Sequence, residues 1–360
     1  MGVNGVDRSL QKTWEGKRLL NHEALALYEA NLMELGMVAD HARKRFHPEN
    51  IVTFLIDRNI NYTNVCVTYC KFCAFYRAPD QTEGSWFYTN DEIFQKIEEL
   101  LKLGGTQVLL QGGHHPKITL EYYTTLLREI KKRFKIHIHS FSAPEIEHLS
   151  RVSKKPVREV LIALREAGLD SVPGGGAEIL VDRVKKIISP LKTTSEKWLE
   201  IHETIHSLGM RSTATMMFGT VETREERILH LEKVRALQDR TKGFTAFIPW
   251  SFCPAETELE GEVEEASGEE YLRTLAISRI YLDNISNIPT GWVTEGYKVG
   301  QVGLSFGAND FGGILMEEKV ISATGVAYTM AIEQALSLIR RSGKVPAQRN
   351  TYYEVLRVFE

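Results

Sequence analysis

The sequence predicts an α/β protein whose main body is a (β/α) TIM-type barrel, full or nearly closed. Three observations favour this fold. Apolar segments rich in branched and aromatic residues alternate with longer amphipathic segments along most of the chain. The alternation amounts to about eight units, enough to close a parallel sheet into a barrel. Glycine-rich or polar motifs follow most of the predicted strands, where such barrels carry their reactive groups.

The chain length fits one barrel with an extension at each end. The chain has 360 residues, and barrels with extensions reach this length as one domain. We expect a helical extension over residues 1–50, the barrel over residues 51–325, and a C-terminal helix and tail packed on the barrel over residues 326–360. Apolar residues at helical spacing in residues 19–28 and 32–45 predict the N-terminal helices.

The predicted barrel elements are assigned by hydrophobic period. The first strand is residues 51–56, which are rich in branched and aromatic side chains. Further strands are predicted at residues 107–111, 136–141, 169–172, 211–217, 243–249, 289–293 and 302–305. Helices are predicted between them at residues 90–103, 120–134, 157–167, 179–188, 195–208, 224–239 and 269–285.

Composition and charge argue against several classes of function. Hydrophobic residues make up 43% of the chain and charged residues 25%, as in ordinary soluble proteins. The net charge of -3 gives no reason to expect nucleic acid or an anionic membrane as a partner. No apolar run approaches the length of a membrane span, and the N-terminus lacks a secretory signal. The four cysteines are spaced too unevenly for a disulfide framework, so we expect a cytoplasmic protein with a small-molecule substrate.

The most informative motif is CxxxCxxC, formed by Cys66, Cys70 and Cys73 directly after the first strand. A structural zinc site usually takes four ligands in two separated pairs, and no second pair exists here. Three cysteines can instead hold an iron–sulfur cubane and leave one iron free for a ligand that is not protein. A zinc knuckle and three core cysteines are alternatives. So is a ferredoxin-like carrier, although such carriers bring a fourth cysteine in register and Cys253 is isolated.

Glycines follow the second strand. Gly112 and Gly113 let the backbone approach a ligand closely, because no side chain obstructs it. His114 comes next and is a candidate substrate contact or base. The alternative is a tight turn that carries two surface histidines, His114 and His115.

Two further candidate groups surround the third strand. His137 and His139 lie two residues apart, so they share one face of the strand. That face either lines the barrel cavity or lies beneath a helix. After the strand, the Ser142 hydroxyl suits a carboxylate or a ribose, and Glu145 is a candidate base.

The loops after the fourth and fifth strands also carry candidates. Glu178 follows a run of three glycines at a helix start, where a carboxylate suits paired hydroxyls. Its alternative role is stabilisation of the helix dipole. Gly219 and Glu222 follow the fifth strand, next to two methionines that are equally consistent with ordinary core.

Later loops have an aromatic and glycine-rich character. Residues 247–254 offer aromatic walls for a flat substrate. Residues 305–313 form a glycine-punctuated polar loop of the kind that holds a ligand, or an ordinary loop, and include Asp310 as a further candidate base.

The cysteine motif, with Phe72 immediately before its last cysteine, resembles the signature of the radical S-adenosylmethionine superfamily. The resemblance implies a 4Fe-4S cluster on the three cysteines and S-adenosylmethionine on the free iron. It also implies cofactor contacts: Phe72 near adenine, Gly112 and Gly113 near the methionine amino group, and Gly219 near adenine. Glu178 would contact the ribose, and Ser142 is a further candidate contact. His114 stands where relatives usually carry an acidic residue.

Longer stretches resemble the cyclic dehypoxanthinyl futalosine synthase family of menaquinone biosynthesis by the futalosine pathway. They are residues 57–66, 73–77, 168–178 and 305–313. Aminofutalosine synthases and deazaflavin-forming radical synthases are near neighbours of this family and remain alternatives. An iron–sulfur electron carrier is the non-enzymatic alternative.

The resemblance implies a radical cyclisation. A 5'-deoxyadenosyl radical would take hydrogen from C4' of the ribose in dehypoxanthine futalosine, and the substrate radical would close onto the benzoate ring. Reduced flavodoxin or ferredoxin is the implied electron donor. The candidates for the catalytic base are His114, His139, Glu145 and Asp310. The candidates for binding the benzoate carboxylate are Arg58, Arg77 and His114.

Overall fold

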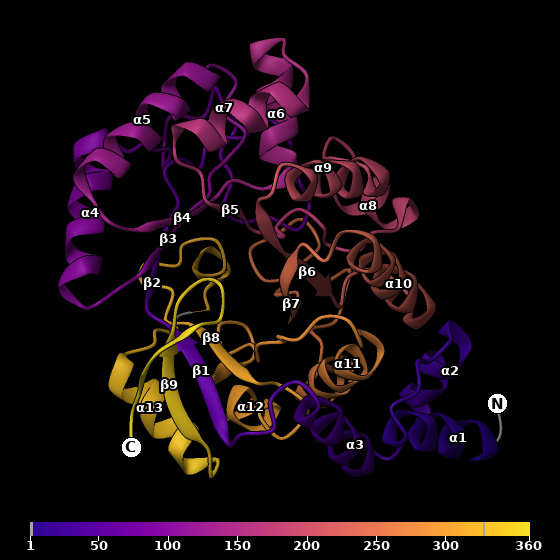
Figure 1. Ribbon diagram of the computed structural model, residues 1–360. Coiled ribbons are helices and arrows are strands. Elements are labelled where there is room, and N and C mark those ends of the chain that lie inside the picture. Colours follow the sequence, from indigo (N-terminus) through magenta and orange to yellow (C-terminus); the bar gives the residue numbers. More distant parts are fainter. Residues whose placement is uncertain (1–2, 327) are drawn as a thin grey trace.

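The computed structural model describes residues 3–326 and 328–360. A ring of strands is surrounded by helices, and the N-terminal helices lie at one side of the ring (Figure 1). The strands are β1 (Ile51–Leu55), β2 (Asp57–Ile60), β3 (Gln107–Leu110), β4 (His137–Ser140), β5 (Ser171–Val172), β6 (Arg211–Phe218), β7 (Phe244–Ser251), β8 (Asp310–Gly313), β9 (Val345–Arg349) and β10 (Val355–Val358).

Thirteen α-helices occur in the part of the chain that the structure describes. They are α1 (Val3–Trp14), α2 (Asn21–Ala26), α3 (Leu32–Lys44), α4 (Asn90–Lys102), α5 (Leu120–Arg133), α6 (Ala143–Ser153), α7 (Val157–Ala167), α8 (Asp182–Ile188), α9 (Ser195–Ser207), α10 (Arg224–Thr241), α11 (Gly268–Tyr281), α12 (Gly296–Gly303) and α13 (Ile332–Arg341). Two short 3-10 helices are η1 (Leu27–Glu29) and η2 (Ser322–Thr324).

The strands close into the predicted barrel. One sheet runs in the order β2-β3-β4-β5-β6-β7, and every neighbouring pair in it is parallel. β1 leads directly into β2 and pairs with β8 in parallel. Isolated bridges from Ala246 to Asn287 and from Pro289 to Asp310 connect β7 to β8. The (β/α) TIM-type barrel is therefore confirmed.

The two faces of the barrel strands differ in burial. On β6, Ser212, Ala214 and Met216 are at most 1% exposed, whereas the intervening Thr213 and Thr215 are half-buried. Ser212 bonds to two histidines of α9, so its side faces the helices and the threonines face inward. The inward positions keep some exposure because the barrel interior is not filled, and their hydroxyls make that interior polar.

The C-terminal segment closes the amino end of the barrel. β9 pairs with β1 in parallel and β10 pairs with β9 antiparallel. Arg349 at the end of β9 donates two hydrogen bonds to the Asp310 carboxylate, at 2.5 and 2.9 Å. Thr53 of β1 donates a third at 2.5 Å. Asp310 is fully buried, so this ion pair fixes the C-terminal segment to β1 and β8.

Several predicted elements were wrong in type or missing. Residues 302–305 were predicted as a strand, but they form the end of α12 and the turn after it. The short apolar run fits the period of a helix as well as that of a strand. Packing favours the helix, in which Gly303 lies so close to Thr290 that a Cβ would be 2.1 Å from its hydroxyl. Residues 289–293 contribute only one bridge. Helix α1 falls within the predicted helical extension, although its bounds were not predicted, and helix α6 was not predicted. The tail contains strands β9 and β10 after the expected helix α13.

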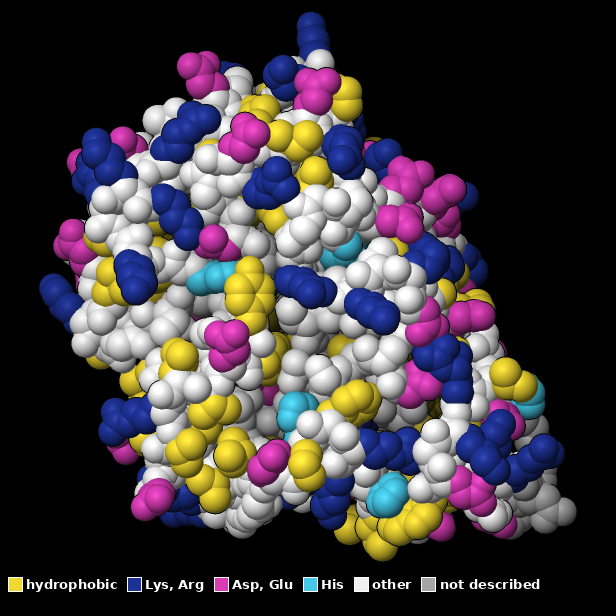
Figure 2. All heavy atoms as spheres, in the orientation of Figure 1, with side chains coloured by type: hydrophobic (Ala, Val, Ile, Leu, Met, Phe, Trp, Pro, Cys, Tyr) yellow, Lys and Arg dark blue, Asp and Glu magenta, His cyan; other side chains and the backbone are white. Residues whose placement is uncertain are grey.

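The surface shown in Figure 2 carries lysine and arginine side chains interspersed with aspartate and glutamate, in keeping with the small net charge. Among the described residues, no helix combines the length and the apolar character that crossing a membrane requires.

The ion pair between Arg349 and Asp310 gives a test of the barrel closure. We expect Arg349→Met to lower the free energy of unfolding by about 3–5 kcal/mol, because it leaves a buried carboxylate without its cation. Denaturant titration measures this. Adding Asp310→Asn to the variant removes the buried charge and should recover part of the loss. A loss below about 1 kcal/mol in the single variant would contradict the account.

Candidate active site

The predicted motifs gather at one end of the barrel. Each follows the carboxyl end of a strand, the end where parallel barrels carry their sites. The segments are residues 61–77 after β2, 111–116 after β3, 141–145 after β4, 173–178 after β5, 219–222 after β6 and 252–254 after β7. Backbone bonds join neighbouring segments, for example from Val67 to His114 at 3.2 Å and from Met217 to Glu178 at 3.1 Å.

The cysteine loop is held by backbone bonds at both ends. The Cys66 amide donates to Arg77 at 2.9 Å, and the Arg77 amide donates to Asn64 at 2.8 Å. In the middle of the loop, the Lys71 amide donates to Ile188 at the end of α8, at 2.9 Å. Cys66 and Cys70 are buried and Cys73 is half-buried. The three thiols are therefore held on a fixed loop with little access to solvent.

The thiols influence one another electrostatically. Burial raises the pKa of the Cys70 thiol to about 12, and Cys73 and Cys66 add to the rise, whereas Lys192 acts in the opposite direction. Burial also raises the pKa of Cys73, although the backbone amides of Tyr76 and Phe75 lower it. The sulfurs are thus close enough to repel one another as thiolates, and a shared cationic group would relieve that repulsion.

The donor set fits a cluster better than a single ion. All three cysteines are free thiols. Across residues 3–326 and 328–360, no three His, Cys, Asp or Glu side chains are close enough together to hold one metal ion. Three thiolates that each bind a different iron of a cubane need not meet at one point, and soft thiolates suit iron–sulfur clusters. Cys66, Cys70 and Cys73 can therefore hold the predicted 4Fe-4S cluster.

A buried ion pair lies beside the cysteine loop. The Glu178 carboxylate accepts from the Nζ of Lys192 at 2.8 Å and from the Nζ of Lys185 at 3.1 Å. The two ammonium groups outweigh the effect of burial and hold the pKa of Glu178 at about 2. Burial alone would lower the pKa of Lys192, but Glu178 and Cys70 raise it above the usual value. Lys192 also lies 5.1 Å from the centre of the Phe72 ring.

The predicted ribose contact, Glu178, is therefore ion-paired in this structure. The alternative role, stabilisation of a helix dipole, does not fit the structure. Helix α8 begins at Asp182, four residues after Glu178. Each carboxylate oxygen has a second lone pair, so the lysines leave acceptor capacity for a hydroxyl.

Gly112 and Gly113 are required by contacts within the chain. A Cβ on Gly113 would lie 2.3 Å from the carbonyl oxygen of Val65, and one on Gly112 would lie 2.7 Å from the Tyr62 ring. The Gly113 amide donates to Thr63 at 2.8 Å. These glycines allow the loop after β3 to pack against the cysteine loop. Because they have no side chain, their backbone is left open to a ligand.

Glu145 is a connecting group between three segments. Its carboxylate accepts hydrogen bonds from the Tyr62 hydroxyl at 2.9 Å, the Gly112 amide at 3.1 Å and the Ser142 hydroxyl at 2.7 Å. Tyr123 in turn donates to Tyr62 at 3.1 Å. Burial raises the pKa of Glu145 to about 7 despite these donors. Ser142 also caps α6, so the hydroxyl predicted to face a ligand has a structural partner.

His114 is buried against a second histidine. Its ring stacks on His148 with centroids 5.2 Å apart, and its Nδ1 is buried without a hydrogen-bond partner among the described residues. Burial, with Lys192 and His148 adding to it, lowers the pKa of His114 well below its usual value. The ring therefore favours the neutral form, and its buried Nδ1 makes no hydrogen bond to the described residues.

The histidines of β4 belong to the barrel wall. His137 and His139 both bond to the Ser171 hydroxyl of β5, each at 2.7 Å. The Ile138 side chain between them is fully buried, whereas His137 packs edge-on against Tyr352 of the C-terminal segment at 5.1 Å. The two histidines therefore share the inward face.

Two predicted site residues lie away from the motif loops. Asp310 pairs with Thr53 of β1 near the amino end of the barrel, where Arg349 binds it. Arg58 points outward and forms ion pairs of 2.6 Å with Glu99 of α4 and with Glu317. The sequence separates these partners by tens to hundreds of residues, so no local pattern could show that both charges were already paired.

Gly219 occupies a conformation that favours glycine, with φ +88. Glu222 accepts from the Gly219 amide at 2.7 Å and from the Thr220 amide at 2.9 Å, and pairs with Arg227 at 2.8 Å. The carboxylate of this motif therefore shapes its own turn, and the Gly219 backbone is left beside the site.

Three non-glycine residues of these loops adopt left-handed backbone conformations. Tyr69, Phe141 and Glu178 adopt left-handed φ values of 47, 64 and 43. Each such non-glycine residue costs on the order of 1 kcal/mol or more, and such residues cluster at functional sites. The loops at this end of the barrel are therefore held in conformations that their sequences do not favour locally.

Four residues that pair with predicted site residues were not predicted from the sequence. Lys192 and Lys185 lie in a polar stretch with no motif, and Ser171 and Arg349 lie in strands without a distinguishing pattern. Only the fold brings them to Glu178, the histidines and Asp310.

Two protein families match the chain. Residues 60–234 match the radical SAM superfamily. Residues 241–360 match the CofH/MqnC C-terminal region. The first match contains the whole cysteine loop, and the second begins just before β7.

Curated relatives match this chain over about nine tenths of their own length or more. The chain is 48% identical to the cyclic dehypoxanthine futalosine synthase of Halalkalibacterium halodurans, covering 100% of this chain and 96% of that protein. It is also 48% identical to the cyclic dehypoxanthine futalosine synthase of Streptomyces coelicolor, covering 98% and 89%. It is 39% identical to the aminodeoxyfutalosine synthase of Thermus thermophilus, covering 97% and 95%.

Solved structures share the architecture. Methylornithine synthase superposes with a TM-score of 0.74 at 19% identity, covering 94% of this chain and 97% of that chain. The FeFe-hydrogenase maturase HydG from Carboxydothermus hydrogenoformans superposes with a TM-score of 0.75 at 16% identity, covering 97% and 81%. At these identities the likeness concerns the fold, and it agrees with the predicted barrel.

Replacing a loop cysteine tests the cluster assignment. We expect Cys70→Ala to lose the cluster after anaerobic reconstitution, because two thiolates cannot hold a cubane that has a free fourth corner. Iron and sulfide analysis measures this. Cys253→Ala is the matched control, since Cys253 is also a buried free thiol but lies after β7. Equal iron and sulfide contents in the two variants would contradict the assignment.

The ion pair of Glu178 gives a pH test. The pKa of this carboxyl is about 2 in the folded chain against a usual 4.5, so its stabilising effect is present above pH 4.5 and is lost as the pH falls through about 2. Between these limits we expect the wild-type protein to lose about 3 kcal/mol more than Glu178→Gln. Urea titrations of the cofactor-free proteins measure this. Parallel stability curves would rule out the ion pair as a pH-dependent contribution.

Proposed function

The chain belongs to the radical SAM superfamily, in the family that includes the cyclic dehypoxanthine futalosine synthases, and from this premise we propose that it converts dehypoxanthine futalosine into its cyclic product. The observation that supports this most is the 48% identity to two such synthases over nearly the whole chain, against 39% for the aminodeoxyfutalosine synthase. The reaction belongs to menaquinone biosynthesis by the futalosine pathway.

The chemistry comes from the cofactors and the geometry from the protein. When bound, the 4Fe-4S cluster and S-adenosylmethionine supply a 5'-deoxyadenosyl radical that takes hydrogen from C4' of the substrate ribose. Cys66, Cys70 and Cys73 hold the cluster. The barrel holds the ribose and the benzoate ring in one conformation and excludes water and other hydrogen donors.

The remaining cofactor contacts follow the motif loops. When S-adenosylmethionine is bound, Phe72 and the Gly219 backbone would contact adenine, and the backbone of Gly112 and Gly113 would contact the methionine group. Glu178 would accept from the ribose hydroxyls through lone pairs that its lysines do not use. Ser142 acts indirectly, because its hydroxyl positions Glu145 and the start of α6.

Among the four candidate bases, His139 is the best placed. Asp310 is bound by Arg349, and Glu145 already accepts from three donors. His114 is stacked against His148. His139 lies on the inward face of β4, at the level of Leu109 and one residue below the strand's carboxyl end, and its ring is hydrogen-bonded through Nδ1. We assign to His139 the proton that the benzoate ring loses on cyclisation.

The external partners are a reductant and the small-molecule substrate. We propose reduced flavodoxin or ferredoxin as the electron donor and the cytoplasm as the place of reaction, since the cluster needs low-potential electrons and free thiols.

The decisive experiment is anaerobic turnover of the reconstituted protein. With dehypoxanthine futalosine, S-adenosylmethionine and a reductant, we expect a product lighter by two hydrogen atoms, together with 5'-deoxyadenosine and methionine. Mass spectrometry of the products measures this. Unchanged substrate in the presence of an intact cluster would refute the assignment.

The same experiment separates the alternatives. An aminodeoxyfutalosine synthase activity would give a product that retains the adenosyl group when the matching acceptor is offered. An electron carrier would hold a cluster whose spectrum does not respond to S-adenosylmethionine.

A further inference from the structure

The unusual feature of the barrel wall is one hydroxyl shared by two histidines. Ser171 Oγ lies 2.7 Å from Nδ1 of His139 and 2.7 Å from Nε2 of His137. A hydroxyl has one proton, so it donates to one ring and accepts from the other. The three groups therefore form a continuous chain of hydrogen bonds across two strands.

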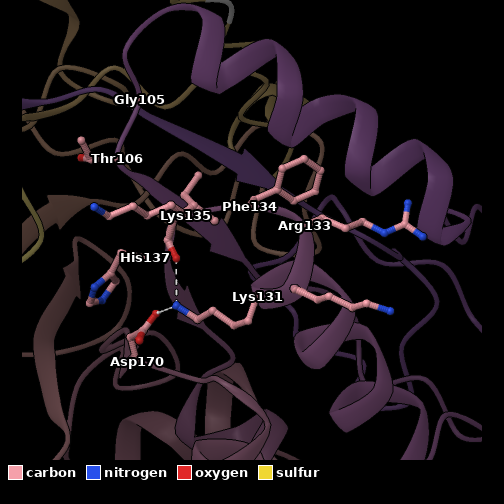
Figure 3. Close-up of a pocket in the computed structure, with 10 residues that line it drawn as sticks. Gly105, Thr106, Lys131, Arg133, Phe134, Lys135, His137 and Asp170 are labelled. Carbon is pink, nitrogen blue, oxygen red and sulfur yellow. Dashed lines mark hydrogen bonds and ion pairs between the residues drawn. The ribbon is translucent and has the colours of Figure 1, made fainter.

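The outer end of this chain opens into a cavity. This cavity is a surface pocket of about 720 Å³, open to solvent, at the amino ends of β3, β4 and β5, and it is lined by His137 and Asp170, among others. Figure 3 shows these two side chains close together, with Lys131 bonded to Asp170 at 2.5 Å. His137 is half-buried there, whereas His139 is 6% exposed. The chain thus leads from the barrel interior to solvent on the side away from the cysteine loop.

We propose that Ser171 and His137 carry the proton taken by His139 out of the closed barrel into this cavity. The inference rests on the proposed function, since it concerns the proton that cyclisation releases. Ser171 and His137 touch no substrate and act through His139, so they are positioning residues for proton transfer.

The protonation states of the rings allow this transfer. Burial lowers the pKa of His139 to about 3 and that of His137 to about 4, so both rings are neutral at ordinary pH. If Nδ1 of His139 donates to Ser171, and Ser171 donates to Nε2 of His137, then Nε2 of His139 is bare and can accept a proton. Of the charged groups around His137, Asp170 raises its pKa and Lys131 lowers it.

A ring C–H bond of the cyclised radical breaks and its proton goes to Nε2 of His139. The bonding pair restores the aromatic ring, and the substrate radical gives up one electron, for which the cluster held by Cys66, Cys70 and Cys73 would be the acceptor when bound. The Nδ1 proton of His139 moves to Ser171, the Ser171 proton moves to His137, and the Nδ1 proton of His137 enters the cavity. When product leaves and water enters the barrel, proton exchange resets the chain.

The chain contains a matched control for this arrangement. On the outer face of β6, Ser212 also lies between two histidines, at 2.9 Å from His202 and 2.7 Å from His206. These groups lie between the barrel and α9 and do not face the interior. His206→Gln therefore perturbs a similar buried trio without touching the proposed path.

The first test measures cyclic product formed per 5'-deoxyadenosine released. His137→Ala and Ser171→Ala should lower this ratio by about tenfold or more, because hydrogen abstraction precedes proton loss and loss of acid–base assistance slows only the later step. His206→Gln should leave it at the wild-type value. Added imidazole should restore the ratio in His137→Ala, where it can enter the cavity, and should not restore it in Ser171→Ala. A wild-type ratio in His137→Ala, or equal rescue of both variants, would overturn the proposal.

The second test needs no turnover. In the cofactor-free protein labelled with ¹⁵N-histidine, Ser171→Ala should change the NMR signals of both His137 and His139 while leaving the signals of His202 and His206 in place. His206→Gln removes the His206 signal and should shift that of His202, while leaving the signals of His137 and His139 in place. Unchanged signals of His137 and His139 in Ser171→Ala would rule out the hydrogen bonds of both rings to the Ser171 hydroxyl and would overturn the proposal. If the NMR signals change as expected but the wild-type protein does not cyclise the substrate, the result refutes the proposed function and leaves the shared hydrogen bonds of Ser171 standing.

Discussion

The active-site end of this barrel depends on the balance between buried negative and positive charges beside the cysteine loop. Three thiols lie on one loop, and burial alone would keep those of Cys70 and Cys73 protonated. Lys192 supplies the opposite charge, and a buried ammonium is itself costly unless it is paired. Glu178 provides that pair, with Lys185 on its other oxygen. The carboxylate, the lysines and the cysteine loop therefore stabilise one another, and none of them fits the site alone.

This balance is possible because the loops are rigid. Gly113 leaves room for the Val65 carbonyl, Glu145 connects Tyr62 to the loops after β3 and β4, and Glu222 fixes the turn at Gly219. Several carboxylates whose motifs suggest a ligand contact therefore accept hydrogen bonds from groups within these loops instead. A radical reaction benefits from such a frame, because a small misplacement exposes the radical to other hydrogen donors.

The parts that the sequence could predict are those with a local signal. The cysteine loop is read from three residues within eight positions. Strands β1 and β3 to β7 follow from hydrophobic period and place the motif loops at one end of the barrel, whereas residues 57–60 form a strand of their own, β2, that the period did not indicate. What could not be predicted depends on partners far along the chain. Asp310 was predicted as a candidate base, but its carboxylate is paired with Arg349. Arg58 was predicted as a candidate for binding the benzoate carboxylate, but it is paired with Glu317. Residues 302–305 were ambiguous in period, and packing made them part of a helix and turn.

The two serine–histidine groups show why position in the barrel matters more than composition. Both place one hydroxyl between two neutral imidazoles, and both are buried in the wall. The group on β6 faces α9 and Phe244, so its rings serve packing. The group on β4 and β5 faces the polar interior and continues to a cavity that contains water-accessible charges. The same chemistry is structural on one face of the wall, and on the other it connects a closed reaction chamber to solvent without opening the chamber itself.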